Sequence, residues 1–213
     1  MPDDIKNNSK IFITLNNYKK YLFKFNIGSL EDLFLIASNK KNKDNRFINI
    51  EFDVDVLDRL SFSDDIDIRT NVALNKKCTL KIFDRLSIDE KSTIRETIAQ
   101  NKNCPLKILN KLSIDKEWHV KYKVAQNSNC SIDTLNKLSF DKEWIVKSGV
   151  ALNKNCTLEI LDRLSIDEKW FVRYNVAKHE NCTIEILKKL SKDKNENVRN
   201  IAIDRLNELK IEC

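Results

Sequence analysis

Apolar positions recur at one fixed interval along most of this chain. In five rows a valine or isoleucine is followed four residues later by another β-branched residue and then by alanine. The first of these columns holds Ile68, Ile94, Val120, Val146, Val172 and Val198. A separate column of leucine, each followed by serine, holds Leu60, Leu86, Leu112, Leu138, Leu164 and Leu190. This register predicts an array of small supersecondary units stacked in one dimension.

Each unit contains two helical segments. Val172, Val176 and Ala177 have the i, i+4, i+5 spacing of one helical stripe, and Ile184 and Leu190 belong to a second short helix. Between the segments most units place an asparagine, which tolerates a left-handed turn and is expected to end the first helix. These residues are Asn75, Asn101, Asn127 and Asn153, with His179 in the same position of the fifth unit. Helices of about two turns are not stable alone, so stability must come from stacking.

The two ends of the chain depart from the repeat. Residues 11–25, rich in β-branched and aromatic side chains around Asn16 and Asn17, predict a small hairpin. A helix is predicted to follow from the N-cap Ser29. We therefore expect an N-terminal cap over 1–45, an array of about six repeats over 46–200 and a capping continuation over 201–213. In the last of these, the final helix runs from Val198 to about Lys210.

The row VRYNVAKHENCTIEILKKLSKD carries a family resemblance. It resembles the bacterial variant leucine-rich repeat, a HEAT-like helical repeat, and the resemblance covers about residues 46–203. It implies a right-handed solenoid of alternating α and 3-10 helices without a sheet. The chain departs from that pattern where the family's Asn-Pro becomes Asn-Lys or Asn-Ser. The iron–sulfur cluster of some members is not carried over, because no cysteine precedes Cys78.

Pattern and resemblance together predict an all-α fold. The expected architecture is a right-handed α/α superhelical solenoid of 26-residue repeats, with α/3-10 as the alternative, and a small N-terminal cap. The chain has two glycines and two prolines, too few for the turns of a sandwich or a doubly wound sheet. Its start is polar and it has no apolar run long enough to span a membrane, so we expect a cytoplasmic protein with reduced thiols.

Five cysteines also keep the repeat register: Cys78, Cys104, Cys130, Cys156 and Cys182. Stacked helical units lie about 8–10 Å apart. That distance is too long for disulfides, which need Cα atoms within about 7 Å, and for a shared metal ion. Because Pro105 favours a first helical position, Cys104 is predicted to be an N-cap, with an acid three residues on completing a capping box in later rows. A reactive thiol is the alternative. We expect no metal and no cofactor.

Two ladders of charge follow the repeat. An aspartate lies six residues before each basic residue of the first helix, as Asp167 does before Arg173, which predicts ties between neighbouring units. The second ladder precedes each repeat leucine and holds Arg59, Arg85, Lys111, Lys137, Arg163 and Lys189. In later rows an acid four residues earlier, such as Glu159 before Arg163, is expected to pair with it. In the front rows that position is Lys81 or Lys107, so we expect uncompensated positive charge there.

Trp118, Trp144 and Trp170 form a column in the segment that enters the first helix. Stacked indoles flanked by lysines are typical of surfaces that grip a partner peptide or nucleobases. The structural alternative is that each indole covers the seam between neighbouring units. Ser92 and Glu196 hold this column in the outer rows, so any aromatic patch is central.

Nothing in the sequence indicates catalysis. His119 and His179 are not in register and neither pairs with an evident nucleophile, and a glycine-rich phosphate loop is absent. We expect a non-enzymatic scaffold for protein–protein interaction, an adaptor or inhibitor, that is monomeric alone and does not bind membranes. The alternative, compatible with the net charge of +6, is a nucleic-acid-binding repeat protein that uses its front basic face. The candidate partner-binding residues are Trp118, Trp144, Trp170, Arg59, Lys81, Arg85, Lys107 and Lys111.

Overall fold

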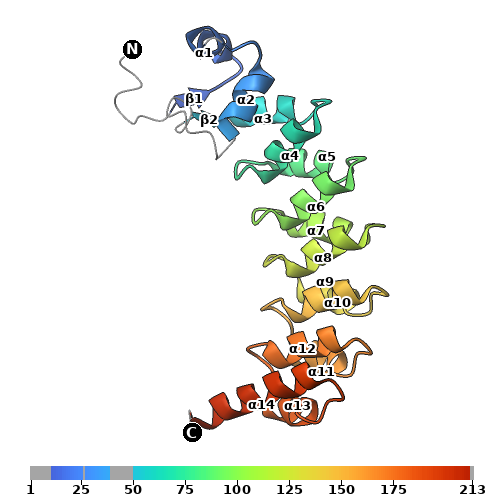
Figure 1. Cartoon of the computed structure of the whole chain (residues 1–213). Coiled ribbons are helices and arrows are strands. Elements are labelled where there is room, and N and C mark those ends of the chain that lie inside the picture. Colours follow the sequence, from blue (N-terminus) through green and yellow to red (C-terminus); the bar gives the residue numbers. More distant parts are fainter. Residues whose placement is uncertain (1–10, 26, 39–49, 212–213) are drawn as a thin grey trace. The chain divides into compact units, whose positions relative to one another are not determined.

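A computed structural model describes residues 11–25, 27–38 and 50–211, and these residues are mostly helical (Figure 1). They form two compact units, 1–103 and 104–213. The first unit contains β1 (Ile11–Ile13), α1 (Tyr18–Phe25), α2 (Leu30–Ser38), β2 (Ile50–Phe52), α3 (Val54–Leu60), α4 (Ile66–Leu74), α5 (Leu80–Leu86) and α6 (Ser92–Gln100). The second contains α7 (Leu106–Leu112), α8 (Trp118–Gln126), α9 (Ile132–Leu138), α10 (Trp144–Ala151), α11 (Leu158–Leu164), α12 (Trp170–Lys178), α13 (Ile184–Leu190) and α14 (Glu196–Ile211).

The predicted all-α repeat fold is confirmed. Each complete repeat pairs an α-helix of eight or nine residues with one of seven, so both members of the pair are α-helical. In the second unit the longer helices lie side by side in the order α8, α10, α12, α14. No helix in the described part of the chain is long and apolar enough to cross a membrane.

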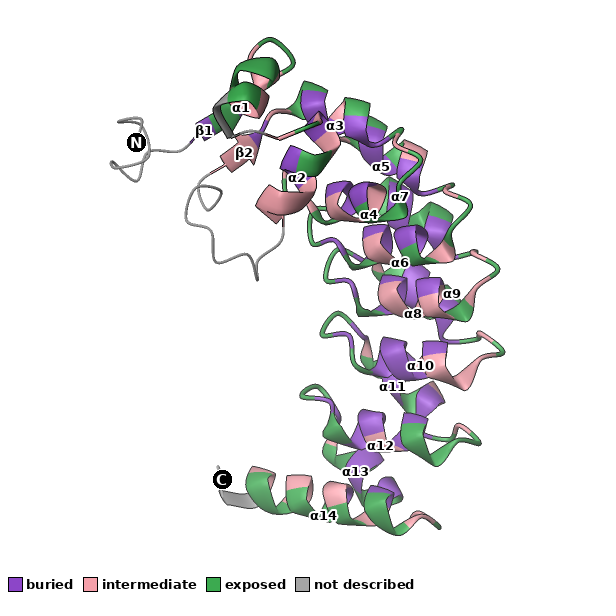
Figure 2. Ribbon diagram, turned by 45° about the horizontal axis from the view of Figure 1, so that its top comes forward, coloured by how far each residue is buried: buried purple, intermediate pink, exposed green. Residues whose placement is uncertain are grey.

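The core of each unit consists of the repeated apolar columns. In α12 the buried apolar residues are Val172, Val176 and Ala177, and in α13 they are Ile186, Leu187 and Leu190. In Figure 2 buried residues, in purple, recur in the helices of both units, where neighbouring helices pack against one another. Since neither helix of a pair is long enough to persist in isolation, this packing is what stabilises them.

The N-terminal cap differs from the prediction. Residues 11–25 do not form a hairpin: β1 pairs in parallel with β2, with Ile11 opposite Ile50, and α1 takes up the rest of the segment. The predicted helix after Ser29 is confirmed as α2, and the Ser29 hydroxyl accepts a hydrogen bond from the Asp32 backbone N–H at 3.0 Å. Since α2 lies beside α4, it occupies the place of a preceding long helix and covers the start of the stack.

The final helix agrees with the sequence. A run from Val198 to about Lys210 was predicted, and α14 extends from Glu196 to Ile211. The chain passes the point where earlier rows place the turn asparagine without a break. The two-unit division, in contrast, falls at Asn103 and Cys104, inside the predicted array of residues 46–200.

The turn asparagines act differently from the prediction. Asn75, Asn101 and Asn127 are extended, with φ of −65° to −72°, so none of the three uses a left-handed conformation. Instead the side chain bonds in two directions. In Asn153, Oδ1 accepts from the Asn155 N–H at 2.9 Å, while Nδ2 donates to the Ala125 carbonyl of the preceding repeat at 2.6 Å. The asparagine therefore both shapes its own turn and ties it to the preceding repeat.

His179 reproduces this arrangement. Its backbone has the same extended conformation, with φ −67° and ψ 135°. Nδ1 accepts from the Asn181 N–H at 3.0 Å, and the other ring nitrogen, Nε2, lies 3.0 Å from the Asn153 carbonyl, to which it donates. An imidazole with one acceptor and one donor nitrogen thus replaces a carboxamide.

The cysteines are not helix caps. The N-cap is the residue after each cysteine: Thr79, Pro105, Ser131, Thr157 and Thr183. Ser131 Oγ accepts from the Thr134 N–H at 3.2 Å, and Thr183 Oγ1 accepts from the Ile186 N–H at 3.3 Å. The predicted capping box is wrong as well, because the acids stand at the second helical position rather than the third.

Candidate interaction surface

The first charged ladder holds neighbouring repeats together. In Arg69–Asp89, at 2.7 Å, and Arg173–Asp193, at 2.6 Å, the aspartate carboxylate binds the basic residue of the long helix in the preceding repeat. Lys121–Asp141 and Lys147–Asp167 follow the same pattern. The six-residue interval corresponds to a different bond, in which Arg173 donates to the Asp167 backbone carbonyl at 2.6 Å. The predicted structural role is confirmed, although the carboxylate binds in the opposite direction along the chain.

These pairs are largely buried. The hydrogen bonds from Arg173 lower the pKa of Asp193, and the Asp193 carboxylate raises the pKa of Arg173. Both groups therefore stay ionised at neutral pH and do not offer their charge to a partner.

In the first unit the positive charge that was predicted to be uncompensated is paired with an acid. Lys81 and Arg85 both bind Asp58, at 2.8 and 2.9 Å, and they lower its pKa, Lys81 first. The Arg85 guanidinium also lies over the Phe62 ring, 3.6 Å from its centre. Two of the candidate cations of the front rows are thus engaged within the first unit.

Other members of this ladder lie close to aromatic or polar groups. Arg59 stands over the Tyr18 ring at 5.9 Å. Arg163 donates to Asn136 Oδ1 of the preceding repeat at 2.5 Å, instead of pairing with Glu159 as the i, i+4 spacing predicts. Lys107 and Lys111 are exposed on α7. Of the five candidate cations, Lys81 and Arg85 are therefore paired with a carboxylate, whereas Lys107 and Lys111 are exposed in the second unit.

The three tryptophans occupy equivalent places. Each is the first residue of its long helix, α8, α10 or α12. Trp144 and Trp170 both contact Phe171 edge-on, with ring centres 5.9 and 5.2 Å apart. The contact of Trp144 with Phe171 crosses the seam between two repeats, as the structural alternative requires. Trp118 contacts His119 instead.

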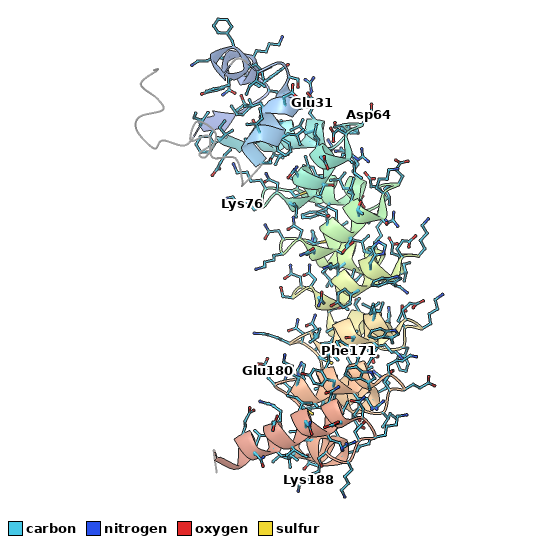
Figure 3. The ribbon with its side chains drawn as sticks, in the orientation of Figure 1. Glu31, Asp64, Lys76, Phe171, Glu180 and Lys188 are labelled. Atoms are coloured by element: carbon cyan, nitrogen blue, oxygen red, sulfur yellow. The ribbon has the colours of Figure 1, made fainter. Side chains whose placement is uncertain are left out.

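Phe171 and Tyr174 complete an aromatic cluster that the repeat columns did not reveal. Tyr174 stacks on Phe171 at 6.2 Å and contacts Trp170 at 6.4 Å. Phe171 directly follows a column tryptophan and Tyr174 lies one helical turn further on, and that spacing was the available signal. We use "aromatic cluster" for Trp144, Trp170, Phe171 and Tyr174. In Figure 3 the Phe171 side chain projects at the start of α12, and Glu180 lies beyond the other end of that helix.

The aromatic cluster lies at the surface of the second unit. Trp170 and Phe171 are 39% and 41% exposed, and Trp118, two long helices earlier on α8, is 43% exposed. Large aromatic side chains half open to water offer apolar area to a partner at little entropic cost. The cluster is therefore both a seam contact and an accessible surface.

Two close contacts fix the helices that carry the aromatic cluster. Gly149 of α10 lies so near α8 that a Cβ there would meet the Tyr122 ring at 2.8 Å. Between α10 and α12, Asn175 Nδ2 donates to Ser148 Oγ at 2.6 Å in a buried hydrogen bond. Small residues and a buried polar link thus keep the helix starts in register, so the surface is preformed rather than adaptable.

The cysteines lie away from this surface, in the core. All five described cysteines are free and buried. Burial raises the pKa of Cys78, Cys130 and Cys156 to about 12 and that of Cys182 to about 11. The helix N-termini therefore do not activate these thiols, and the reactive-thiol alternative loses its physical basis.

This burial predicts slow thiol chemistry in the native protein and loss of stability in alkali. A thiol reagent at pH 8 should modify the repeat cysteines far more slowly than in denaturant, where all six thiols of the chain should titrate. Because the folded pKa is raised above the ordinary value of 9.0, the stabilising effect is complete below pH 9. It is lost as pH rises from 9 towards 12. Thermal melts across that range measure the loss, and equal thiol reactivity in native and denatured protein would contradict the burial.

Comparison with known proteins concerns the fold alone. No protein-family model matches the chain, and no curated protein matches its sequence. A similar solved structure is described as a leucine-rich repeat variant with a novel repetitive protein structural motif. It shares 20% identity with this chain at a TM-score of 0.36, over 83% of this chain and 82% of the other. The fold assignment rests on the helices and their repeated packing described above.

Proposed function

We propose that this chain is a non-catalytic repeat scaffold that binds another protein. The observation that carries the proposal is the half-exposed aromatic cluster on the second unit. Trp170 and Phe171 contact each other, Trp144 contacts Phe171, and Tyr174 contacts both. Tryptophan and tyrosine are the residues most enriched at the energetic centres of protein interfaces. An adaptor or an inhibitor, cytoplasmic and monomeric when alone, would fit this arrangement.

Rigidity supports a binding role for the aromatic cluster. The helices that bear it are held by the Gly149 contact and by the bond from Asn175 to Ser148. A preformed site avoids part of the ordering cost that association otherwise incurs. Because the cluster begins at helix starts rather than in long loops, its geometry is fixed by the repeat core.

The nucleic-acid alternative has less support. It relied on Lys81 and Arg85 as unpaired cations, and both are paired with Asp58 in the first unit. A surface that binds phosphates needs cations available to replace counterions. The remaining candidates are Arg59, which lies over the Tyr18 ring in the first unit, and Lys107 and Lys111 on one short helix of the second.

Affinity capture with matched variants tests this proposal. The tagged full chain is incubated with native lysate, with and without nuclease, and retained proteins are quantified by mass spectrometry. We expect specific partners that survive nuclease and that the double variant Trp170→Ser, Phe171→Ser fails to retain. Loss of two central aromatic contacts typically weakens an interface by about 2 kcal/mol or more. Leu158→Ser, which changes a half-exposed apolar residue on α11, is the control and should retain the same partners.

The variants remain informative because the altered side chains are exposed. Circular dichroism must show that the double variant keeps the helical content and melting behaviour of the parent. Retention of identical partners by the folded double variant would refute the role of the aromatic cluster. Retention that disappears with nuclease would instead support the nucleic-acid alternative.

A further inference from the structure

A second column of large apolar residues is exposed at the turns that follow the short helices. In the second unit it comprises Ile114, Phe140 and Ile166, which are 85%, 66% and 67% exposed. Each stands two residues after a buried repeat leucine, Leu112, Leu138 or Leu164. We call these three residues the apolar ridge. Single exposed apolar residues are common, but one per repeat at a fixed position forms a regular array.

Cations accompany the apolar ridge. Arg163 lies with its guanidinium 4.1 Å from the centre of the Phe140 ring, and its hydrogen-bond partner is the neutral amide of Asn136. Lys137 is exposed three residues before Phe140, at the equivalent ladder position one repeat earlier. The ridge therefore combines exposed apolar side chains with positive charge. The hydrogen-bond partner of Arg163 is itself uncharged.

The first unit contains the same motif in a neutralised form. Arg85 lies over Phe62 as Arg163 lies over Phe140, but Arg85 is paired with the carboxylate of Asp58. Asp58 and Asn136 occupy the same position of the repeat, one row before their respective arginines. Two charged positions distinguish the copies: the acid Asp58 becomes the amide Asn136, and Lys81, four residues before Arg85, becomes Glu159, four residues before Arg163. The hydrogen-bond partner of Arg163 is the amide and not Glu159.

The amides are confined to two successive rows of that column. Asn110 precedes Asn136 in the column and stands one row before Lys137, and the next member, Asp162, is an acid again. From Arg85 to Lys189, Lys137 and Arg163 are therefore the two ladder cations that have an amide instead of an acid at this position one row earlier. These two cations belong to the same rows of the second unit as Phe140 and Ile166.

We propose that the apolar ridge, with Lys137 and Arg163, binds an extended acidic segment of a partner protein. The two cations attract the acidic side chains of the segment, and the apolar side chains of the ridge provide the contact area. Successive repeats stack about 8–10 Å apart, and a polyproline II chain advances about 9 Å in its three-residue turn. A segment with an apolar side chain at every third position would therefore place one on each ridge residue, with acids between them. This site uses none of the residues of the aromatic cluster.

A nucleic acid fits the apolar ridge less well. Isoleucine has no flat face on which a base can stack, and Arg163 already covers one face of Phe140. Phosphate contacts fix position through charge alone and gain nothing from Ile114 or Ile166. The two cations are also few for a surface that holds a nucleic-acid backbone.

Binding of synthetic peptides to the full chain tests the proposal. The probe is a fluorescent peptide of four Leu-Glu-Pro triplets, and fluorescence anisotropy measures its affinity. The matched peptides replace glutamate with lysine or leucine with serine. We expect saturable binding of the first peptide, weakened by added salt, and about tenfold or greater losses for both substitutions in the peptide.

Protein variants locate the site. Asn136→Asp recreates the pair of the first unit beside Arg163 and should weaken binding about tenfold while leaving thermal stability at least unchanged. Phe140→Ala should weaken it to a similar extent. Phe62→Ala, the equivalent change in the neutralised copy, is the matched control and should leave the affinity as it was. Because all three positions are polar or exposed, the variants are expected to fold, and circular dichroism verifies this.

Several results would overturn this inference. Absence of binding by the glutamate peptide is one, and equal binding of the lysine peptide is another. Unchanged affinity of Asn136→Asp would remove the role of charge. A single-stranded oligonucleotide that binds more tightly than the peptide would assign the ridge to nucleic acid. A dimer that Phe140→Ala dissociates would assign it to a second copy of the chain. None of these outcomes depends on the aromatic cluster, so failure here leaves the proposed function standing.

Discussion

Substitution of Arg173 by methionine is expected to destabilise the protein by about 3–5 kcal/mol, because breaking a buried ion pair leaves its partner charged without compensation. Arg173 is buried, binds both carboxylate oxygens of Asp193, at 2.6 and 2.7 Å, and donates to the backbone carbonyls of Asp167 and Glu168. The variant leaves the Asp193 carboxylate and two backbone carbonyl groups without the guanidinium that binds them at the contact between repeats. Chemical denaturation of parent and variant measures the difference in free energy of unfolding.

Lys142→Met is the control for this prediction. Lys142 lies 4.0 Å from Glu143, and its side chain is almost fully exposed. Exposed pairs of this kind contribute about 0–1 kcal/mol, so the variant should unfold almost as the parent does. If Arg173→Met and Lys142→Met lose similar amounts of stability, the buried ladder does not hold the repeats together.

The sequence predicted the existence of this ladder but not its pairing. The register of Asp167 and Arg173 is visible as a six-residue interval, and that interval does correspond to a bond, from the guanidinium to the Asp167 carbonyl. The carboxylate instead reaches the long helix of the preceding repeat, where it binds Lys147. That choice depends on how successive repeats stack, and a single linear period contains no information about it.

In the N-terminal cap, by contrast, the predicted type of secondary structure was itself wrong. Residues 18–25 contain Tyr18, Tyr21, Leu22 and Phe25, which have the i, i+3, i+4, i+7 spacing of a helix. The hairpin prediction rested on the β-branched and aromatic composition of residues 11–25, and it was wrong. The strand partner of Ile11–Ile13 lies near residue 50, so no local turn signal could have revealed the parallel pair.

The candidate surface was only partly visible in the sequence. The tryptophan column was found because it keeps the repeat register. Phe171 is the one phenylalanine in its column, and Tyr174 is separated from Tyr122 by Ser148 in the row between, so neither forms a continuous column. The apolar ridge posed a different difficulty. Its residues keep the register as faithfully as the core columns do, so the repeat pattern alone does not separate them from buried positions. Periodicity identifies a column, but the structure is needed to show that Ile114 and Phe140 face water.

The turn asparagines show why this repeat manages with so little glycine. Their backbone is extended, so no left-handed residue is required, and the side chain bonds to the turn in the place of backbone groups. The same carboxamide reaches the preceding repeat, as Asn101 does at 2.6 Å from the Ala73 carbonyl. Local turn formation and stacking between repeats are therefore coupled through one side chain.

Asn153→Ala is accordingly expected to cost about 2–4 kcal/mol, since each buried polar group left without a partner costs about 1–3 kcal/mol. The substitution removes the bonds from Nδ2 to the carbonyls of Ala125 and Asn127, at 2.6 and 3.0 Å, and the bond from the Asn155 N–H. Asn155→Ala is the matched control, because Asn155 also bonds to the preceding repeat, at the Ser128 carbonyl, but at an exposed position.

A third variant, Asn153→His, separates loss of the hydrogen bonds from loss of side-chain volume. His179 already makes equivalent bonds at this position with its two ring nitrogens. Histidine at 153 should therefore recover a large part of the stability that alanine loses, while Asn155→Ala should lose less than about 1 kcal/mol. Chemical denaturation ranks the four proteins. If Asn153→His is no more stable than Asn153→Ala, the turn asparagine does not stabilise the stack through these bonds, and the likeness between His179 and its asparagine counterparts has no energetic meaning.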